Sequence, residues 1–262
     1  MAYLYETHLH TAGVSKCAAS GGADYIAGYI DKGYTGIIVT DHFFNANCAL
    51  SRRLPWEKWV DAFCRGYEDA REEGEKRGLD VFFGWEETFD NCDDYLVYGL
   101  DKEWLKNHPE ARNWTRGEQY RAVKEAGACV VQAHPFRQRH YIDRVILSTA
   151  CVDAVEVANL GNDREADALA FRYAKKIGKP MVAGSDIHDT SAIKRDSIYG
   201  VYFNKKLNNI FDFVDAVCNN QIADLKVEKG RFDYHGNETV SIPWEVRDAG
   251  DRVTGRHWKE VI

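Results

Sequence analysis

Short runs of apolar residues alternate along the chain with segments in which apolar residues recur every three or four positions. The runs predict buried strands, and the spaced residues predict helices with one apolar face. The predicted strands are Tyr3–Glu6, Gly36–Thr40, Val81–Gly84, Tyr95–Leu100, Ala128–Gln132, Ala154–Val157 and Met181–Gly184. Strands separated by helices indicate βαβ units and a parallel sheet.

Two segments carry the helical pattern clearly. The first follows Pro55, a residue typical of a first helical turn, and places on one face Trp56, Trp59, Val60, Phe63 and Tyr67. The second ends before Gly178 and Pro180 and places on one face Ala166, Leu169, Ala170, Tyr173, Ala174 and Ile177. About seven such repeats favour an α/β fold closed into a TIM-like barrel over an open, doubly wound sheet.

The repeat stops after residue 221. The segment Asp224–Ile262 has mixed charge and alternating stretches such as Thr239–Val246, but it shows no strand–helix repeat. We therefore expect one barrel domain over residues 1–221 and a C-terminal appendage over residues 222–262 that packs on the same domain.

Composition narrows the class of protein. An aromatic content of 13% excludes a disordered chain, and no run approaches the roughly 18 apolar residues of a membrane span. Seven cysteines, scattered singly, suit reduced thiols, and the first residues do not resemble a signal peptide, so we expect a cytoplasmic protein. A net charge of −7 argues against bulk electrostatic binding of nucleic acid, which is not expected as a partner.

Histidines and carboxylates gather where predicted strands end. The histidines are His8, His10, His42, His134 and His188, and two of the carboxylates are Glu86 and Asp186. Each alone has a structural explanation, such as a helix cap or a turn, but in a barrel the carboxyl ends of the strands meet at one mouth. Converging carboxylates repel one another, and divalent cations relieve that repulsion. Imidazole and carboxylate ligands without clustered thiolates suit zinc, manganese or iron better than calcium.

These positions belong to five short motifs. In chain order they are His8-Leu9-His10-Thr11, Thr40-Asp41-His42, Gly84-Trp85-Glu86, Ala133-His134-Pro135 and Gly184-Ser185-Asp186-Ile187-His188. In residue type and order they resemble the successive motifs of the PHP (polymerase and histidinol phosphatase) family. The resemblance implies a distorted barrel of about seven βα units, with two or three divalent metal ions (Zn, Mn or Fe) at its C-terminal mouth.

The resemblance also implies a role for each ligand. One metal ion is expected on His8, His10, Glu86 and Asp186. Glu86 bridges to a second ion that also binds His134, and a third ion takes His42 and His188. Glu86, Asp186 and His188 are the expected catalytic residues. Glu87 lies on the opposite strand face and is expected to be structural or supporting.

The sequence departs from the family pattern in two places. Where the family often has a histidine, this chain has Asn91-Cys92-Asp93-Asp94, and Asp94 is the nearest substitute ligand. Asp101 is a second possibility or a helix cap. The loop after His10 lacks the usual histidine or aspartate for a third ion, so two ions or three stay open. Cys17 in that loop is either a ligand or a small buried residue.

Arginines near the mouth are candidates to bind phosphate, because the guanidinium fork matches phosphate oxygens. We expect this role for Arg137, Arg164 and Arg195, with Arg139 and Lys194 nearby. Glu156 and Asn159 are expected to orient the metal ligands.

The expected activity is that of a hydrolase acting on a small-molecule phosphate ester, similar to histidinol phosphatases, through a metal-bound hydroxide. The sequence contains no serine nucleophile elbow, P-loop or HExxH motif. The alternative is a phosphodiesterase or nuclease acting on nucleotides or DNA ends. An amidohydrolase is disfavoured because Thr-Asp-His and Asp-x-His match the PHP pattern. A metal-binding scaffold without turnover is the remaining alternative.

Overall fold

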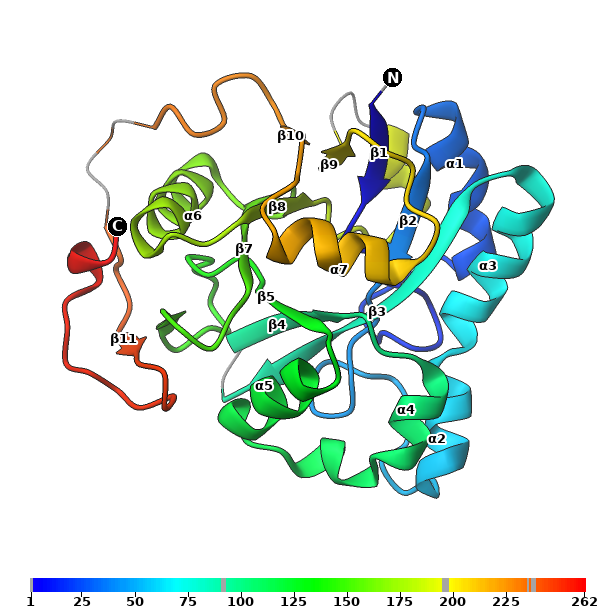
Figure 1. Ribbon diagram of the computed structural model, residues 1–262, viewed down its shortest axis with the longest axis horizontal. Coiled ribbons are helices and arrows are strands. Elements are labelled where there is room, and N and C mark those ends of the chain that lie inside the picture. The colour runs from blue at the N-terminus through cyan, green and yellow to red at the C-terminus, as the bar shows by residue number, and fades with distance from the viewer. Residues whose placement is uncertain (1, 91–92, 195–197, 235, 237–238) are drawn as a thin grey trace.

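The computed structural model describes residues 2–90, 93–194, 198–234, 236 and 239–262. Its strands are β1 (Tyr3–Glu6), β2 (Gly36–Val39), β3 (Asp80–Phe89), β4 (Asp93–Tyr98), β5 (Cys129–Gln132), β6 (Val145–Ser148), β7 (Ala154–Asn159), β8 (Met181–Gly184), β9 (Gly200–Phe203), β10 (Asp224–Lys226) and β11 (Trp244–Arg247). Nine of them form one sheet in the order β10-β9-β1-β2-β3-β4-β5-β7-β8, which curls until β8 lies beside β9 (Figure 1). The expected α/β, TIM-like barrel is confirmed.

The strands do not all run in the same direction. β1, β2 and β3 are parallel, as are β5, β7 and β8. β4 is antiparallel to both β3 and β5, and β9 is antiparallel to β1. The expectation of a wholly parallel sheet is therefore wrong at β4 and β9. β3 ends at Phe89 and β4 begins at Asp93, which leaves too few residues between them for the helical crossover that parallel neighbours need.

Helices cover the outside of the barrel. They are α1 (Ile26–Asp31), α2 (Trp56–Phe63), α3 (Arg65–Arg77), α4 (Lys102–Asn107), α5 (Arg116–Glu125), α6 (Arg164–Ile177) and α7 (Ile210–Cys218), with short 3-10 turns at Gly22–Tyr25, Pro109–Asn113, Thr190–Lys194 and Trp258–Glu260. The helix predicted after Pro55 is two helices that meet at Cys64. The helix α6 agrees with its sequence signals, since the Asp163 side chain caps its start and Gly178, with φ of 68°, ends it.

One end of the barrel is closed by α7. Its side chains Phe213, Val214 and Val217 pack against inward-facing strand residues, among them Tyr5 and Val131. This contact lies at the end opposite the carboxyl ends of β1 and β5, with α7 running across the sheet in the foreground of Figure 1. The carboxyl ends therefore remain as the one face where polar side chains can gather around an opening.

The C-terminal residues add two strands. β10 extends the main sheet beside β9, and β11 pairs in parallel with β6 in a separate two-stranded sheet. The boundary at residue 221 between barrel and appendage stays a prediction. No helix in the described part of the chain combines the length and hydrophobicity that a membrane crossing requires.

Candidate metal centre

The carboxyl ends of β1, β2, β5 and β8, the middle of the longer β3 and the start of β4 bring the expected ligands together. The cluster contains all eight of them: His8, His10, His42, Glu86, Asp94, His134, Asp186 and His188. Isolated bridges between Leu9 and Ile187, and between His42 and Glu86, carry the strand alignment beyond the regular sheet. Residues 180 positions apart in the chain thereby line one mouth, as a closed barrel requires.

Side-chain distances in the cluster fit shared metal ions. The Nε2 atoms of His8 and His10 lie 3.1 Å apart, and His10 Nε2 lies 3.2 Å from an oxygen of Asp186. Glu86 Oε1 lies 3.4 Å from His8 Nε2. Ligand atoms about 2.1 Å from one ion are separated by roughly 3.0–3.4 Å in tetrahedral or octahedral geometry. The buried donors therefore have the types and spacing that a divalent ion needs.

Three of the histidines are oriented so that Nε2 faces the cluster. The Nδ1–H of His8 donates to Glu156 Oε1 at 2.9 Å, and that of His188 donates to the Asp186 carbonyl at 2.8 Å. His10 Nδ1 lies 3.2 Å from the Ser15 hydroxyl. A hydrogen bond at Nδ1 leaves the lone pair of Nε2 available to a metal ion. The expected orienting role of Glu156 has this geometric basis.

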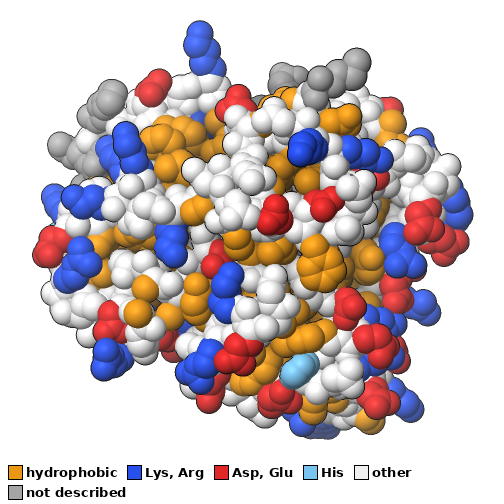
Figure 2. Space-filling view, viewed as in Figure 1, with side chains coloured by type: hydrophobic (Ala, Val, Ile, Leu, Met, Phe, Trp, Pro, Cys, Tyr) orange, Lys and Arg blue, Asp and Glu red, His pale blue; other side chains and the backbone are white. Residues whose placement is uncertain are grey.

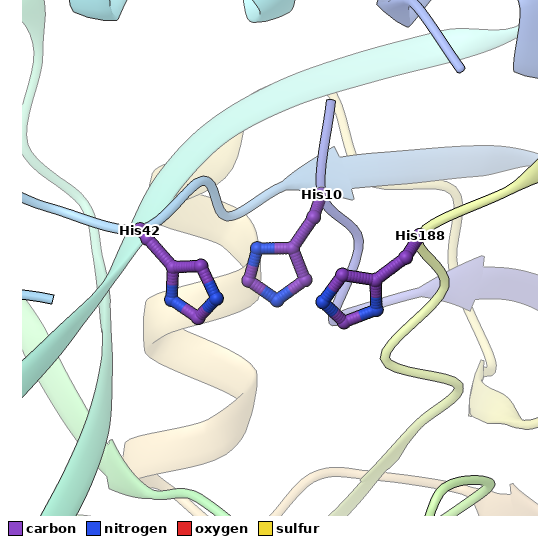
Figure 3. A group of neighbouring side chains, drawn as sticks. All are labelled: His10, His42 and His188. Carbon is purple, nitrogen blue, oxygen red and sulfur yellow. The ribbon is translucent and has the colours of Figure 1, made fainter. Parts of the chain in front are cut away.

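Two further groups adjoin this pair of histidines. Glu86, Asp94 and His134 offer donor atoms within 4.8 Å of one another, and Glu86 Oε1 lies 3.1 Å from His134 Nε2. On the other side, His10, His42 and His188 form an all-histidine group (Figure 3), and the ring centroid of His10 lies 4.3 Å from that of His42 and 4.4 Å from that of His188. Glu86 and His10 stand between the groups, so one centre can hold more than one ion.

The backbone is strained at two of the ligands. His134 has φ of 30° and Asp186 has φ of 53°, in the region that side chains other than glycine rarely adopt. The His134 N–H donates to Glu156 Oε2 at 3.1 Å, and the Asp186 N–H donates to the His8 carbonyl at 2.9 Å. These bonds hold both residues in conformations that aim their side chains into the mouth.

Electrostatics set the protonation of the ligands. Burial, together with neighbouring His42, lowers the pKa of His10 to about 3, so its imidazole is neutral, as metal binding requires. Burial opposes ionisation of Glu86, but His8 and His42 outweigh it and hold its pKa well below the ordinary range. Burial and the nearby Glu86 raise the pKa of Asp94. Like charges are crowded there, which a cation would relieve.

A supporting carboxylate, Asp41, has a role that the sequence analysis did not assign. It is buried and accepts hydrogen bonds from the backbone and hydroxyl of Thr11, and from the Ser15 hydroxyl at 2.6 Å. Ser15 in turn accepts from His10, so Asp41 fixes the rotation of a ligand it does not touch. Its place in the Thr-Asp-His motif was the available signal.

The three candidate phosphate-binding arginines have different positions. Arg137 reaches the cluster, where its guanidinium donates to Asp186 at 2.9 Å, to Asn159 at 2.7 Å and to Asn162 at 2.8 Å. Arg164 is exposed and donates to backbone carbonyls of residues 229 and 230, away from the residues that line the mouth. Arg195 lies outside the described residues.

The structure also places three residues whose roles the sequence did not decide, namely Asp101, Glu87 and Cys17. Asp101 caps α4 by accepting from the Trp104 N–H at 2.7 Å. Glu87 points away from the metal cluster and accepts from the Gln119 amide at 3.2 Å. Cys17 is exposed instead of buried and lines the mouth beside His42 and His188. Burial would raise the pKa of its thiol, but those two histidines lower it to about 6.

The cluster opens into a cavity of about 570 Å³. Its lining combines the exposed ligands with neighbouring side chains: Cys17, His42, Asn45, Ala46, Asn47, Glu86, Thr88, Asp90, Asp94, His134, Arg137, Tyr141, Asp186 and His188. A volume of this size lies within the roughly 300–1,000 Å³ of small-molecule sites. None of the five sequence motifs contains Asn45, Asn47 or Tyr141.

The fold and the clustered ligands define a barrel with a candidate metal centre at its mouth. No protein-family model matches the sequence, and no curated protein matches it. Among solved structures, similarity extends to a two-domain protein from Bacteroides vulgatus that contains a predicted PHP-like metal-dependent phosphoesterase, with a TM-score of 0.60 and 17% identity over 85% of this chain. The fold is thus that of the PHP-like phosphoesterases, and the resemblance seen in the motifs is confirmed.

Endonuclease Q has a similar fold. The enzyme from Pyrococcus furiosus, a lesion-specific endonuclease, gives a TM-score of 0.55 at 12% identity over 86% of this chain. A second Endonuclease Q structure, in complex with a 27-mer duplex carrying an abasic lesion, gives 0.54 at 12% identity over 84%. This chain spans 64% of the Bacteroides protein and 57–58% of the Endonuclease Q chains.

The Endonuclease Q structures correct one expectation. Net acidity led us not to expect nucleic acid as a partner, and that expectation is wrong, because this fold includes a protein solved on a DNA duplex. Net charge averages over the whole surface and does not describe one groove. Figure 2 shows cationic and anionic side chains interspersed on one face, so a total of −7 leaves room for local positive charge.

Proposed function

We propose that this protein is a metal-dependent phosphoesterase of the PHP family that hydrolyses a small phosphate ester. The observation that carries the proposal is the opening of the histidine–carboxylate cluster into a cavity of about 570 Å³. Divalent ions bound there would activate water and neutralise charge on phosphate oxygens, which is the chemistry that phosphate-ester hydrolysis needs.

The chain's own residues support this reaction by position and charge. His8 and His10 are held by Glu156 and Ser15, so their ring nitrogens do not have to reorganise when a metal ion binds. Arg137 lines the cavity, and its side chain is only 13% exposed. Its guanidinium donates to the side-chain amide oxygens of Asn159 and Asn162, which fix its plane. A guanidinium held beside the candidate metal ligands supports the proposal, because it can donate paired hydrogen bonds to a phosphate.

A second candidate function is cleavage of phosphodiesters in nucleic acid. The specific observation in its favour is the shared fold with Endonuclease Q, together with a pair of ligand groups that could serve monoesters and diesters alike. We place the small ester first because the cavity has the volume of a small-molecule site.

A substrate screen on protein of measured metal content tests both candidates. The panel contains sugar phosphates, nucleotides, histidinol phosphate, and a DNA duplex with and without an abasic lesion. We expect turnover of small esters that disappears after chelation and returns with Mn²⁺ or Zn²⁺. Cleavage of the duplex without turnover of any small ester would favour the second candidate, and chelator-resistant activity would contradict both.

A further inference from the structure

The cavity has an aromatic wall that the metal chemistry does not explain. Tyr141 is 50% exposed and lines the cavity that contains Glu86 and His188. The other large hydrophobic side chains found exposed in the described residues are Leu54, Phe211, Trp244 and Val253, and none of these lines the cavity. Single exposed hydrophobic residues are common on protein surfaces, but one placed at a metal centre needs an explanation.

Tyr141 belongs to a connection of distinctive composition. Residues 133–144 join β5 to β6 and carry three arginines, two histidines and the tyrosine. The ring of His140 stands perpendicular to that of Tyr141, with centroids 5.2 Å apart. Arg137 reaches the metal ligands from the same connection, and Arg139 is exposed. Aromatic and cationic side chains combined in this way are typical of sites that bind a base and its phosphate.

The connection is anchored, so the ring is not on a loose loop. The Gln138 side chain donates to the Thr239 carbonyl at 3.2 Å and accepts from the backbone and hydroxyl of Ser241, both at 2.8 Å. Arg144 forms an ion pair with Glu245 of β11. Contacts on both sides of Tyr141 lower the entropy cost of using it as a binding surface.

The cavity also offers a polar contact, from the side-chain amide of Asn47. Asn47 lines the same cavity, is exposed, and its side chain has no hydrogen-bond partner within the described part of the chain. An asparagine amide donates and accepts at once, which matches the edge of a nucleobase. The cavity therefore offers a flat apolar surface, a bifunctional amide and a phosphate-directed arginine.

We propose that Tyr141 is a substrate-binding residue that stacks on a nucleobase, so that the esters this site prefers are nucleoside phosphates. This inference rests on the proposed phosphoesterase function and adds the chemical class of the leaving group. The nucleoside phosphate can be a free nucleotide or the terminal nucleotide of a strand, since both present a base next to a phosphate.

The test compares two esters that differ only by the base. Adenosine 5′-monophosphate and ribose 5-phosphate are offered to the metal-loaded, full-length protein, and kcat/KM is measured for each. Stacking on an aromatic side chain favours a base by about 5- to 150-fold, so the wild type should prefer the nucleotide by a factor in that range. Tyr141→Ala should bring the ratio close to one by lowering kcat/KM for the nucleotide.

Control variants separate stacking from general damage. Tyr141→Phe keeps the ring and should keep the preference. Phe211→Ala removes an aromatic residue that is 57% exposed on α7, outside the cavity, and should leave both substrates unaffected. Calorimetric binding of the same two esters to Mn²⁺-loaded protein gives the same comparison without turnover.

The possible results test the role of Tyr141 separately from the proposed phosphoesterase activity. Equal kcat/KM and equal affinity for the two esters, or a preference that survives Tyr141→Ala, overturns the role of Tyr141 while phosphoesterase activity stands. Tighter binding of the nucleotide with no hydrolysis of either ester supports base recognition and contradicts the proposed function. A 5′-phosphorylated oligonucleotide, with and without a base on its terminal nucleotide, identifies the source: preference for it over the free nucleotide points to strand ends.

Discussion

Glu86 and Glu87 are neighbours in β3 with equal burial and opposite electrostatic environments. Glu86 lies among histidines, which overcome the effect of burial and hold its pKa well below the ordinary range. Glu87 faces the other side of the strand, where burial raises its pKa to about 7. Its Oε1 atom has no hydrogen-bond partner within the described residues. The partners, and not the depth of burial, therefore decide which carboxylate is charged.

The difference matters because only an ionised carboxylate binds a metal ion well. Strand alternation sends the two side chains to opposite faces, so a single residue step separates the metal centre from a structural pocket. In that pocket the Glu87 carboxyl accepts from Gln119, and Arg116 nearby partly offsets its burial. A prediction about one glutamate therefore has a matched control in the other.

The largest effect is expected for the pair Glu86→Gln and Glu87→Gln. Glu86→Gln removes a charge that both ligand groups share, so metal content should fall at more than one position and kcat/KM should drop by about 10³-fold or more. Glu87→Gln should retain wild-type metal content. Plasma emission analysis and kinetics on both variants measure this, and similar losses in the two would erase the distinction between the strand faces.

The next effect is on stability and its pH dependence. The Glu87 carboxyl has a pKa of about 7 when folded against about 4.5 when unfolded, so the folded protein holds this proton more tightly. The resulting stabilisation is complete below about pH 4.5 and is lost as the pH rises through 7. Glu87→Gln removes that dependence.

Between pH 5 and pH 8 the wild type should therefore lose up to about 3 kcal/mol of stability relative to Glu87→Gln. Urea unfolding of both proteins at each pH gives the value. A parallel pH dependence in the two proteins would show that Glu87 is ionised throughout this range.

Removing metal ions from the cluster around Glu86 should lower the stability of the folded protein. Ligands that bind only the native protein stabilise it by about 2.7 kcal/mol at a hundredfold excess over Kd. We expect chelation to lower the melting temperature of the wild type and of Glu87→Gln, with little change in Glu86→Gln. An unchanged melting temperature in all three would mean that the cluster binds no metal in the native protein.

The smallest effect is expected away from both glutamates. Arg137→Ala removes a charge-assisted contact to phosphate and should reduce kcat/KM by about 10- to 150-fold, with metal content retained. Arg164→Ala, an exposed arginine that contacts only backbone carbonyls in the described structure, should behave as wild type. Equal kinetics in the two variants would move phosphate binding to other residues.

The clustering of the candidate ligands was predictable because short sequence patterns indicate it. His8 and His10 show their common face by spacing alone, and Asp186 and His188 follow an apolar run that is a strand in the structure. Gly178 marks the end of α6 in both sequence and structure. These apolar runs are shorter than most helices, and their length therefore favours a strand over a helix.

The remainder depended on contacts that no pattern encodes. Alternation along β4 is the same whichever way the strand runs, so its antiparallel direction was not foreseeable. Asp41 acts on His10 through Ser15, which requires the folded loop to be seen. Arg164 was judged by its neighbours in sequence, whereas its side chain contacts the C-terminal segment.

The contacts between the C-terminal residues and the connection before β6 have an evolutionary consequence. Gln138 is held by Ser241, and Arg144 by Glu245, while every candidate metal ligand except His134 lies outside this connection. Mutations in residues 239–247 can thus shift the position of Tyr141 and leave the metal ligands intact. Descendants of such a protein could change what they recognise by drift at the end of the chain, without passing through an inactive ancestor.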